Sequence, residues 1–94
     1  MKIEIKFSAH AKEKMRSRGV KTSDILAGIK EPDSVYNDVE HGTVVSIKKV
    51  NGNSIIIAYK MEKDRAKVIT LFYTTKLEKL IRAKTGRGAW KKQK

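Results

Sequence analysis

Two runs decide the fold, Ser54-Ile-Ile-Ile-Ala-Tyr-Lys60 and Lys67-Val-Ile-Thr-Leu-Phe-Tyr-Thr74. Each contains an almost continuous apolar stretch of three to five residues, bounded by charged or hydroxyl-bearing residues. Continuous apolar residues over so short a length are typical of strands that are covered on both faces. We therefore expect these two strands to form the centre of one sheet.

Turn signals before and between these two runs divide the chain into strands. His41-Gly42, Asn51-Gly52-Asn53 and Lys63-Asp64 separate the chain from residue 34 onward into four strands. Residues 2–7 alternate charged and apolar side chains, as a strand with one wet face does. The sequence thus predicts a mainly antiparallel sheet of four to five strands.

Helical signals flank the strands. Ser8 can cap a helix that Gly19 ends, and a second short helix stops before Pro32. A third, basic helix follows residue 75 and ends at residue 86. We expect a single α+β domain over residues 1–85, with two N-terminal helices on the sheet and a C-terminal basic helix, followed by a flexible basic tail over residues 86–94.

Charge points to the kind of partner. The 94 residues include 22 lysines and arginines against 10 acidic residues, a net charge of +12. The surplus lies at the two ends, residues 1–20 and 76–94, while residues 21–75 are almost neutral. Such a distribution favours a phosphate-rich partner, RNA above all. If the two ends meet in space, they form one binding surface.

Several classes of protein and site are excluded or disfavoured. The chain has no cysteine, so disulfides, thiolate nucleophiles and cysteine metal sites are impossible. With two histidines and scattered carboxylates we expect no metal and no cofactor, and His41 is interpreted as a surface turn residue. No apolar run is long enough for a membrane span or a secretory signal, which predicts a cytoplasmic protein with no membrane partner.

The first helix carries a candidate catalytic group. His10, Lys14 and Arg18 lie at spacings that share one helix face, with Arg16 nearby. In metal-free RNA cleavage a base removes the 2′-hydroxyl proton, an acid protonates the leaving 5′-oxygen, and cations stabilise the phosphorane. His10 could be that base or acid. The alternative is that His10 packs near the helix start and the cations form a solvated face.

Two further groups could contact a nucleic acid. Thr70 and Tyr73 lie near the end of a central strand, where Tyr73 could stack on a base or donate to phosphate, or could simply lie at the edge of the core. The C-terminal segment offers candidate substrate-binding side chains that can neutralise phosphate or stack on bases, namely Arg82, Arg87, Trp90 and Lys91. Alternatively, Trp90 docks on the fold and fastens the C-terminus.

A family resemblance adds to these expectations. The stretch from Phe7-Ser-Ala-His10 through Arg18-Gly-Val20, together with residues 68–73, resembles a family of small uncharacterised prokaryotic domains grouped with the RelE/ParE/BrnT-like toxins and the microbial-ribonuclease-like fold. The resemblance implies a RelE-like α+β domain with ribonuclease activity, with His10 and Arg18 matching the helix motif and Thr70 and Tyr73 the last strand. Lys14 stands where the family pattern has arginine.

Together these observations predict an RNA-binding, metal-independent endoribonuclease, the mRNA interferase-like toxin of a toxin–antitoxin pair. Its expected partners are RNA, including ribosome-associated mRNA, and an acidic antitoxin protein. The alternative is a non-catalytic nucleic-acid-binding or regulatory protein that uses the same basic surface.

Overall fold

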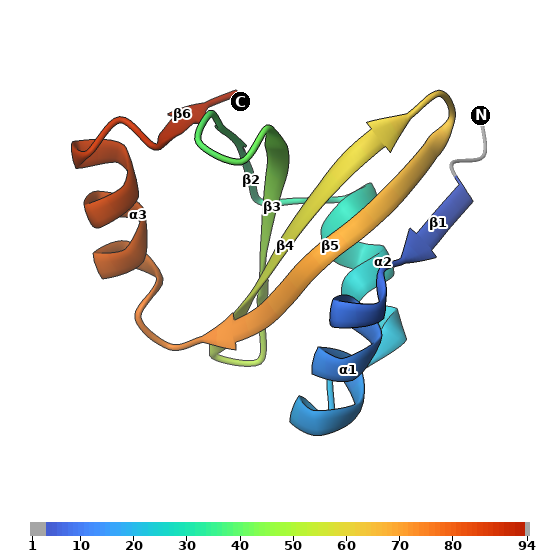
Figure 1. Cartoon of the computed structure of the whole chain (residues 1–94). Coiled ribbons are helices and arrows are strands. Elements are labelled where there is room, and N and C mark those ends of the chain that lie inside the picture. The colour runs from blue at the N-terminus through green and yellow to red at the C-terminus, as the bar shows by residue number, and fades with distance from the viewer. Residues whose placement is uncertain (1–3, 94) are drawn as a thin grey trace.

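The computed structural model describes residues 4–93, which form three helices and six strands (Figure 1). The elements in chain order are β1 (Glu4–Phe7), α1 (Ala9–Arg18), α2 (Thr22–Lys30), β2 (Ser34–Asp38), β3 (Thr43–Val50), β4 (Asn53–Glu62), β5 (Arg65–Thr74), α3 (Leu77–Gly86) and β6 (Trp90–Lys92). None of the helices in this described range is long and apolar enough to span a membrane.

All six strands belong to one sheet, in the order β1-β5-β4-β3-β2-β6. From β2 through β5 each strand pairs antiparallel with the next, and β6 pairs antiparallel with β2. The exception is β1, which pairs parallel with β5, Glu4 lying opposite Arg65. The two ends of the chain thus supply the two opposite edges of the sheet.

Strand β4 lies inside the sheet and buries side chains on both faces. Ile55 and Ile57 belong to one core cluster, and Ile56 belongs to a second one on the other face. All three are at most 2% exposed. Because successive side chains of a strand point to opposite faces, this triplet requires cover on both sides. The expectation of two-sided burial for this strand is confirmed.

The helices provide that cover in two layers. Helices α1 and α2 contribute Ala11 and Ile25 to the cluster that contains Ile55 and Ile57. Helix α3 packs Leu80 and its apolar neighbours against the cluster that contains Ile56. Figure 1 shows α3 on the other side of β4 and β5 from α1 and α2.

The α+β class is confirmed, but the predicted sheet is wrong. We expected four to five mainly antiparallel strands carrying two N-terminal helices, whereas the sheet has six strands, is mixed, and carries helices on both faces. The parallel contact joins residue 4 to residue 65, a separation that no local pattern can reveal. The sixth strand has only three residues, two of them lysines, so its sequence looks like a solvated tail.

The predicted C-terminal tail is likewise corrected. Residues 90–92 form β6 along β2. Gln93 continues the contact, because its backbone N–H donates to the Val35 carbonyl at 2.8 Å. Trp90 is only 5% exposed and belongs to the second core cluster. The alternative in which Trp90 docks on the fold therefore describes the structure. An edge strand and a buried indole tie this segment to the domain.

The two basic ends of the chain do not meet within the described residues. Strand β1 and strand β6 are opposite edges of the sheet, and α1 and α3 cover opposite faces. The protein thus carries two basic surfaces. One follows α1, and the other, here called the C-terminal surface, consists of the cations of α3 and β6 with their flanks, Lys76, Lys79, Arg82, Lys84, Arg87 and Lys92.

Gly28 sets how closely α2 approaches the sheet. A Cβ at this position would lie 2.5 Å from Cδ1 of the fully buried Ile57. We expect Gly28→Val to lower the free energy of unfolding by about 1–3 kcal/mol, the usual cost of overpacking a core. Gly86→Ala is the matched control, because nothing lies within 4 Å of a Cβ there. Urea unfolding of both variants would measure this, and equal stability would contradict the close packing of α2.

Candidate functional site

A cavity of about 240 Å³ lies between the sheet and α3. Its apolar lining comes from β3, β4, β5 and α3, with Ile56, Phe72 and Leu80 among the side chains. Its polar and aromatic side chains come from segments distant in sequence, namely Asp38, His41, Thr43, Thr70, Lys84 and Trp90. A mainly apolar cavity with a few converging polar groups is the usual form of a small-molecule site.

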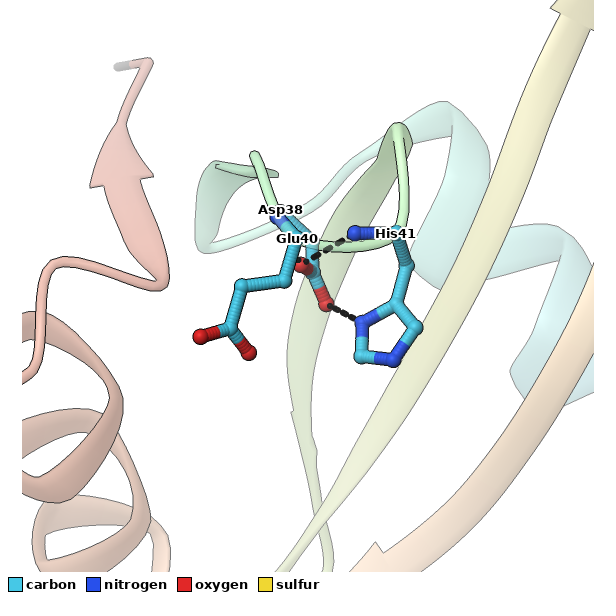
Figure 2. Close-up of side chains that lie close together, drawn as sticks. All are labelled: Asp38, Glu40 and His41. Atoms are coloured by element: carbon cyan, nitrogen blue, oxygen red, sulfur yellow. Dashed lines mark hydrogen bonds and ion pairs between the residues drawn. The ribbon is translucent and has the colours of Figure 1, made fainter.

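Asp38, the last residue of β2, holds the following turn. Its Oδ1 accepts the backbone N–H groups of Glu40 at 3.0 Å and of His41 at 3.1 Å, and its Oδ2 lies 2.9 Å from Nδ1 of His41 (Figure 2). Gly42, at φ 66°, allows the chain to reverse. Asp38 is 9% exposed, while the His41 side chain is 66% exposed. The Asp38–His41 pair therefore joins a buried carboxylate to an accessible imidazole.

The carboxyl of Asp38 is ionised at neutral pH. Burial raises its pKa, but the hydrogen bonds and charge of His41 lower it, as does the nearby Trp90 indole, and the resulting pKa lies below the ordinary 3.8. An ionised carboxylate can only accept, so in neutral His41 it holds the proton on Nδ1 and leaves the lone pair on Nε2. His41 is therefore arranged to accept a proton through Nε2, the ring nitrogen farther from Asp38 in Figure 2.

Trp90 lines the cavity with its ring and keeps its N–H buried. Its ring packs on Tyr36 with centroids 5.5 Å apart, and Nζ of Lys84 lies 6.0 Å from the centre of the indole. Although the indole is near enough to Asp38 to lower the pKa of that carboxyl, its buried Nε1 makes no hydrogen bond of ordinary geometry within residues 4–93. An unpaired buried N–H costs about 1–3 kcal/mol, and its burial keeps this Nε1 beside Asp38 and out of reach of solvent.

An irregularity of β5 directs Thr70 toward the cavity. The β4–β5 register shifts between Ala58, whose partner is Thr70, and Tyr59, whose partner is Val68. Ile69 is therefore an extra residue, and such a bulge re-aims the side chains around it. Ile69 and Thr70 both line the cavity, whereas Val68 packs in the core on the opposite face.

Ser8 ties this bulge to the start of α1. Its Oγ donates to the Ile69 carbonyl at 2.9 Å, and its backbone N–H donates to the Val68 carbonyl at 2.9 Å. The same Oγ accepts the N–H of Ala11 at 3.0 Å, and Gly19, at φ 61°, ends the helix. The predicted caps of this helix are confirmed, and the first of them also stabilises the strand that carries Thr70.

The turn also offers a set of possible metal ligands. The ligand atoms of Asp38, Glu40 and His41 all lie within 4.8 Å of one another. However, Glu40 is paired with Arg87 at 3.4 Å, and its carboxylate points away from the imidazole in Figure 2. A metal ion would have to displace both this guanidinium and the Nδ1 proton of His41. The three side chains fit proton transfer better than metal binding.

The residues singled out from the sequence fall into two groups on opposite faces of the sheet. Thr70 and Trp90 line the cavity, and Arg87 pairs with Glu40 beside it. Arg82 is exposed on α3, whereas Lys91 is exposed on β6, where alternation from Trp90 directs its side chain to the opposite face of the sheet. The other group lies on the α1 side and consists of His10, Lys14, Arg16, Arg18 and Tyr73.

The α1 group is spread out. His10 is exposed near the start of α1, and Arg18 is its last residue, about 12 Å further along the helix axis. Arg16 is exposed and pairs with Glu13, and Lys14 is half-buried. A base and a cation that act on one phosphate must both reach it, so the structure does not bring His10 and Arg18 together.

Tyr73 is engaged in a structural contact. Its hydroxyl donates to Oδ2 of Asp24 at 2.7 Å and accepts the backbone N–H of Lys21 at 3.4 Å. Burial, and then the Asp24 carboxylate, raise the pKa of Tyr73 above 10.0, so the phenol is held in its protonated form. Tyr73 fastens the start of α2 to the end of β5.

Sequence reasoning missed Asp38, His41 and Lys84 as members of one site. The local signal was Asp38-Val-Glu-His41-Gly42, in which a carboxylate lies three residues before an imidazole at a turn. Such a spacing allows the Asp side chain to bind the turn amides and the ring together. Lys84 carries no comparable signal, because only the packing of α3 brings it to the cavity.

For Tyr73 we expect Tyr73→Phe to lower the free energy of unfolding by about 1–2 kcal/mol, since it leaves Asp24 without its partner. Tyr59→Phe is the matched control, a half-buried tyrosine of the same face. Urea unfolding and RNA cleavage should be measured together. Loss of cleavage at unchanged stability would instead support the catalytic role predicted for Tyr73.

The Asp38 contacts predict a pH-dependent stability. Because its pKa is lowered by folding, Asp38 stabilises the protein above its unfolded pKa of 3.8, and this contribution disappears as the pH falls through the lower folded value. Asp38→Ala should therefore lower the free energy of unfolding by about 1.5–3 kcal/mol near neutrality, and by less in acid. Urea unfolding at several pH values would measure this. A difference that stays constant with pH would contradict the lowered pKa, and exposed Asp64→Ala serves as the control.

Comparison with known families covers most of the described chain. A family model described as "Domain of unknown function (DUF4258)" matches residues 7–73, which include Asp38, His41 and Thr70 but not α3 or β6. Among curated proteins and among solved structures, nothing matches the chain. The family description names no activity and provides no link to the RelE/ParE/BrnT toxins. This chain belongs to the DUF4258 family.

Proposed function

We propose that this protein binds single-stranded RNA and cleaves it without a metal ion, with His41 as the general base. One observation supports this above the others, the Asp38–His41 pair at a cavity that also contains Lys84. A carboxylate that fixes the imidazole tautomer is a recurring device of histidine general bases. The cytoplasmic location expected from the sequence belongs to the same proposal.

The C-terminal surface supplies the electrostatic attraction for RNA in this proposal. Its six cations are accompanied by one carboxylate, Glu78, between residues 76 and 92. An open groove of about 670 Å³ lies beside the start of α3, where the cations Lys49, Lys76 and Lys79 outnumber the single carboxylate of Glu78 and are joined by small polar side chains, Asn53 and Ser54. Lysines and small polar groups along a groove suit the phosphates of a strand better than its bases.

The chemistry is a transesterification within the RNA. Nε2 of His41 removes the proton of a ribose 2′-hydroxyl, and the 2′-oxygen forms a bond to the adjacent phosphorus. The bond from phosphorus to the 5′-oxygen breaks, and the leaving oxygen takes a proton from water. Lys84 stabilises the charge on the phosphorane, as a cation in a partly dry site does. The products are a 2′,3′-cyclic phosphate and a 5′-hydroxyl, and the proton on His41 returns to solvent.

This assignment moves the proposed base from His10 to His41. Both histidines are exposed, but a carboxylate orients the ring only at His41 among residues 4–93. The cations of α1 then become a second basic surface, to which the acidic antitoxin expected of a toxin could bind. RNA binding without cleavage remains the alternative function, with the same C-terminal surface.

We expect the purified protein to cut RNA in EDTA, to leave 2′,3′-cyclic phosphate ends, and to bind DNA without cutting it. His41→Ala should lower the cleavage rate by about 10²- to 10⁴-fold, the usual contribution of a general base, and should leave affinity nearly unchanged. His10→Ala is the matched control, and its rate should stay close to that of the wild type. Gel analysis of end-labelled RNA measures all of these.

Two outcomes would redirect the proposal. If His10→Ala abolishes cleavage and His41→Ala does not, the base is His10, as first expected from the sequence. If no variant or wild-type protein cuts RNA, with or without ribosomes, while all bind it, the non-catalytic alternative holds.

A further inference from the structure

The cavity beside His41 has a shape and chemistry that the cleavage step alone does not need. We infer that it holds a single unpaired nucleobase of the RNA, so that the strand is bound by an extruded base as well as by its phosphates. This inference rests on the proposed function and specifies its substrate class as single-stranded RNA.

The cavity is small. Pockets for drug-sized ligands span roughly 300–1,000 Å³, and the cavity measures about 240 Å³. It is therefore matched to one ring system rather than to a whole nucleotide. The apolar lining by Ile56, Phe72 and Leu80 suits the faces of a planar heterocycle, which lose water when they are enclosed.

The polar groups of the cavity match the edge of a base. Trp90 lines the cavity with its indole ring, on which the face of a base can pack, while its Nε1–H is buried beside Asp38. The Thr70 hydroxyl can both donate and accept, so it complements either kind of group on a base edge. Single-stranded RNA is the form in which such edges are open, because duplex pairing engages them.

The position of the cavity links base binding to the reaction. His41 and Lys84 line the same cavity as Trp90 and Thr70, so a base held inside keeps its own ribose and phosphate beside them. Holding the ribose 2′-hydroxyl beside His41 in this way makes the proton transfer effectively unimolecular. A base that cannot leave its stack, as in a duplex, would keep its 2′-hydroxyl away from His41.

Trp90 is the only tryptophan of the chain and therefore reports directly on the cavity. We expect the four nucleoside 3′-monophosphates to quench its fluorescence with saturation, whereas ribose 5-phosphate and inorganic phosphate should not. Ala58→Phe, which places a ring in the cavity, should weaken this binding at least about tenfold. Thr70→Val, which keeps the shape and removes the hydroxyl, should weaken it about three- to tenfold.

Matched controls lie on the other face of the sheet. Ala9→Phe and Thr22→Val change exposed residues of α1 and α2 and should leave quenching as in the wild type. Circular dichroism and urea unfolding verify that each variant is folded. If Ala58→Phe does not fold, the result for Thr70→Val decides the test.

The outcomes separate this inference from the proposed function. RNA binding and cleavage without saturable quenching by any of the four monophosphates would overturn the base site and leave the function standing. Quenching that Thr70→Val leaves unchanged would also overturn it. Saturable quenching that both variants weaken, with no RNA cleavage, would support the base site while the nuclease proposal fails.

Discussion

The structure depends on the burial of β4 on both of its faces. Ile55 and Ile57 require cover from α1 and α2, and Ile56 requires cover from α3 and β6. Burying one isoleucine side chain contributes about 1.5–3 kcal/mol, a large share of the stability of a domain of this size. The second requirement explains why the C-terminal segment is not a free tail. It closes over Ile56 and brings Trp90 to the β2–β3 turn.

Two local devices then convert this architecture into a site. The bulge in β5, held by Ser8 just after the neighbouring strand β1, turns Thr70 toward α3. The hydrogen bonds of Asp38 hold His41 above the same cavity. Each of these two contacts joins residues that the hydrophobic periodicity of strands and helices does not link. As a result, the chemistry-bearing side chains gather on the α3 face, and the α1 face retains a basic surface without an oriented histidine in the described chain.

Some of this could be predicted from sequence and some could not. Capping by Ser8, the stop at Gly19 and the two-sided burial of Ile55 to Ile57 are local properties, and each was predicted correctly. The parallel contact of β1 with β5 and the docking of β6 on β2 join residues that are far apart in the sequence. Local hydrophobic periodicity therefore cannot predict these contacts. Predicting the Asp38–His41 pair would have required the side-chain directions of a turn. Sequence shows only that two suitable residues lie three apart.

The central claim is that RNA lies on the α3 face and not on the α1 face. Its most direct test is RNA affinity as a function of salt for two triple variants, Lys79→Ala/Arg82→Ala/Lys92→Ala on the C-terminal surface and Lys12→Ala/Arg16→Ala/Arg18→Ala on α1. For single strands each lost phosphate contact should flatten the slope of log K against log salt by about 0.7. We expect weaker binding and a flatter salt slope for the first variant, and the wild-type affinity and slope for the second. The reverse pattern would contradict it.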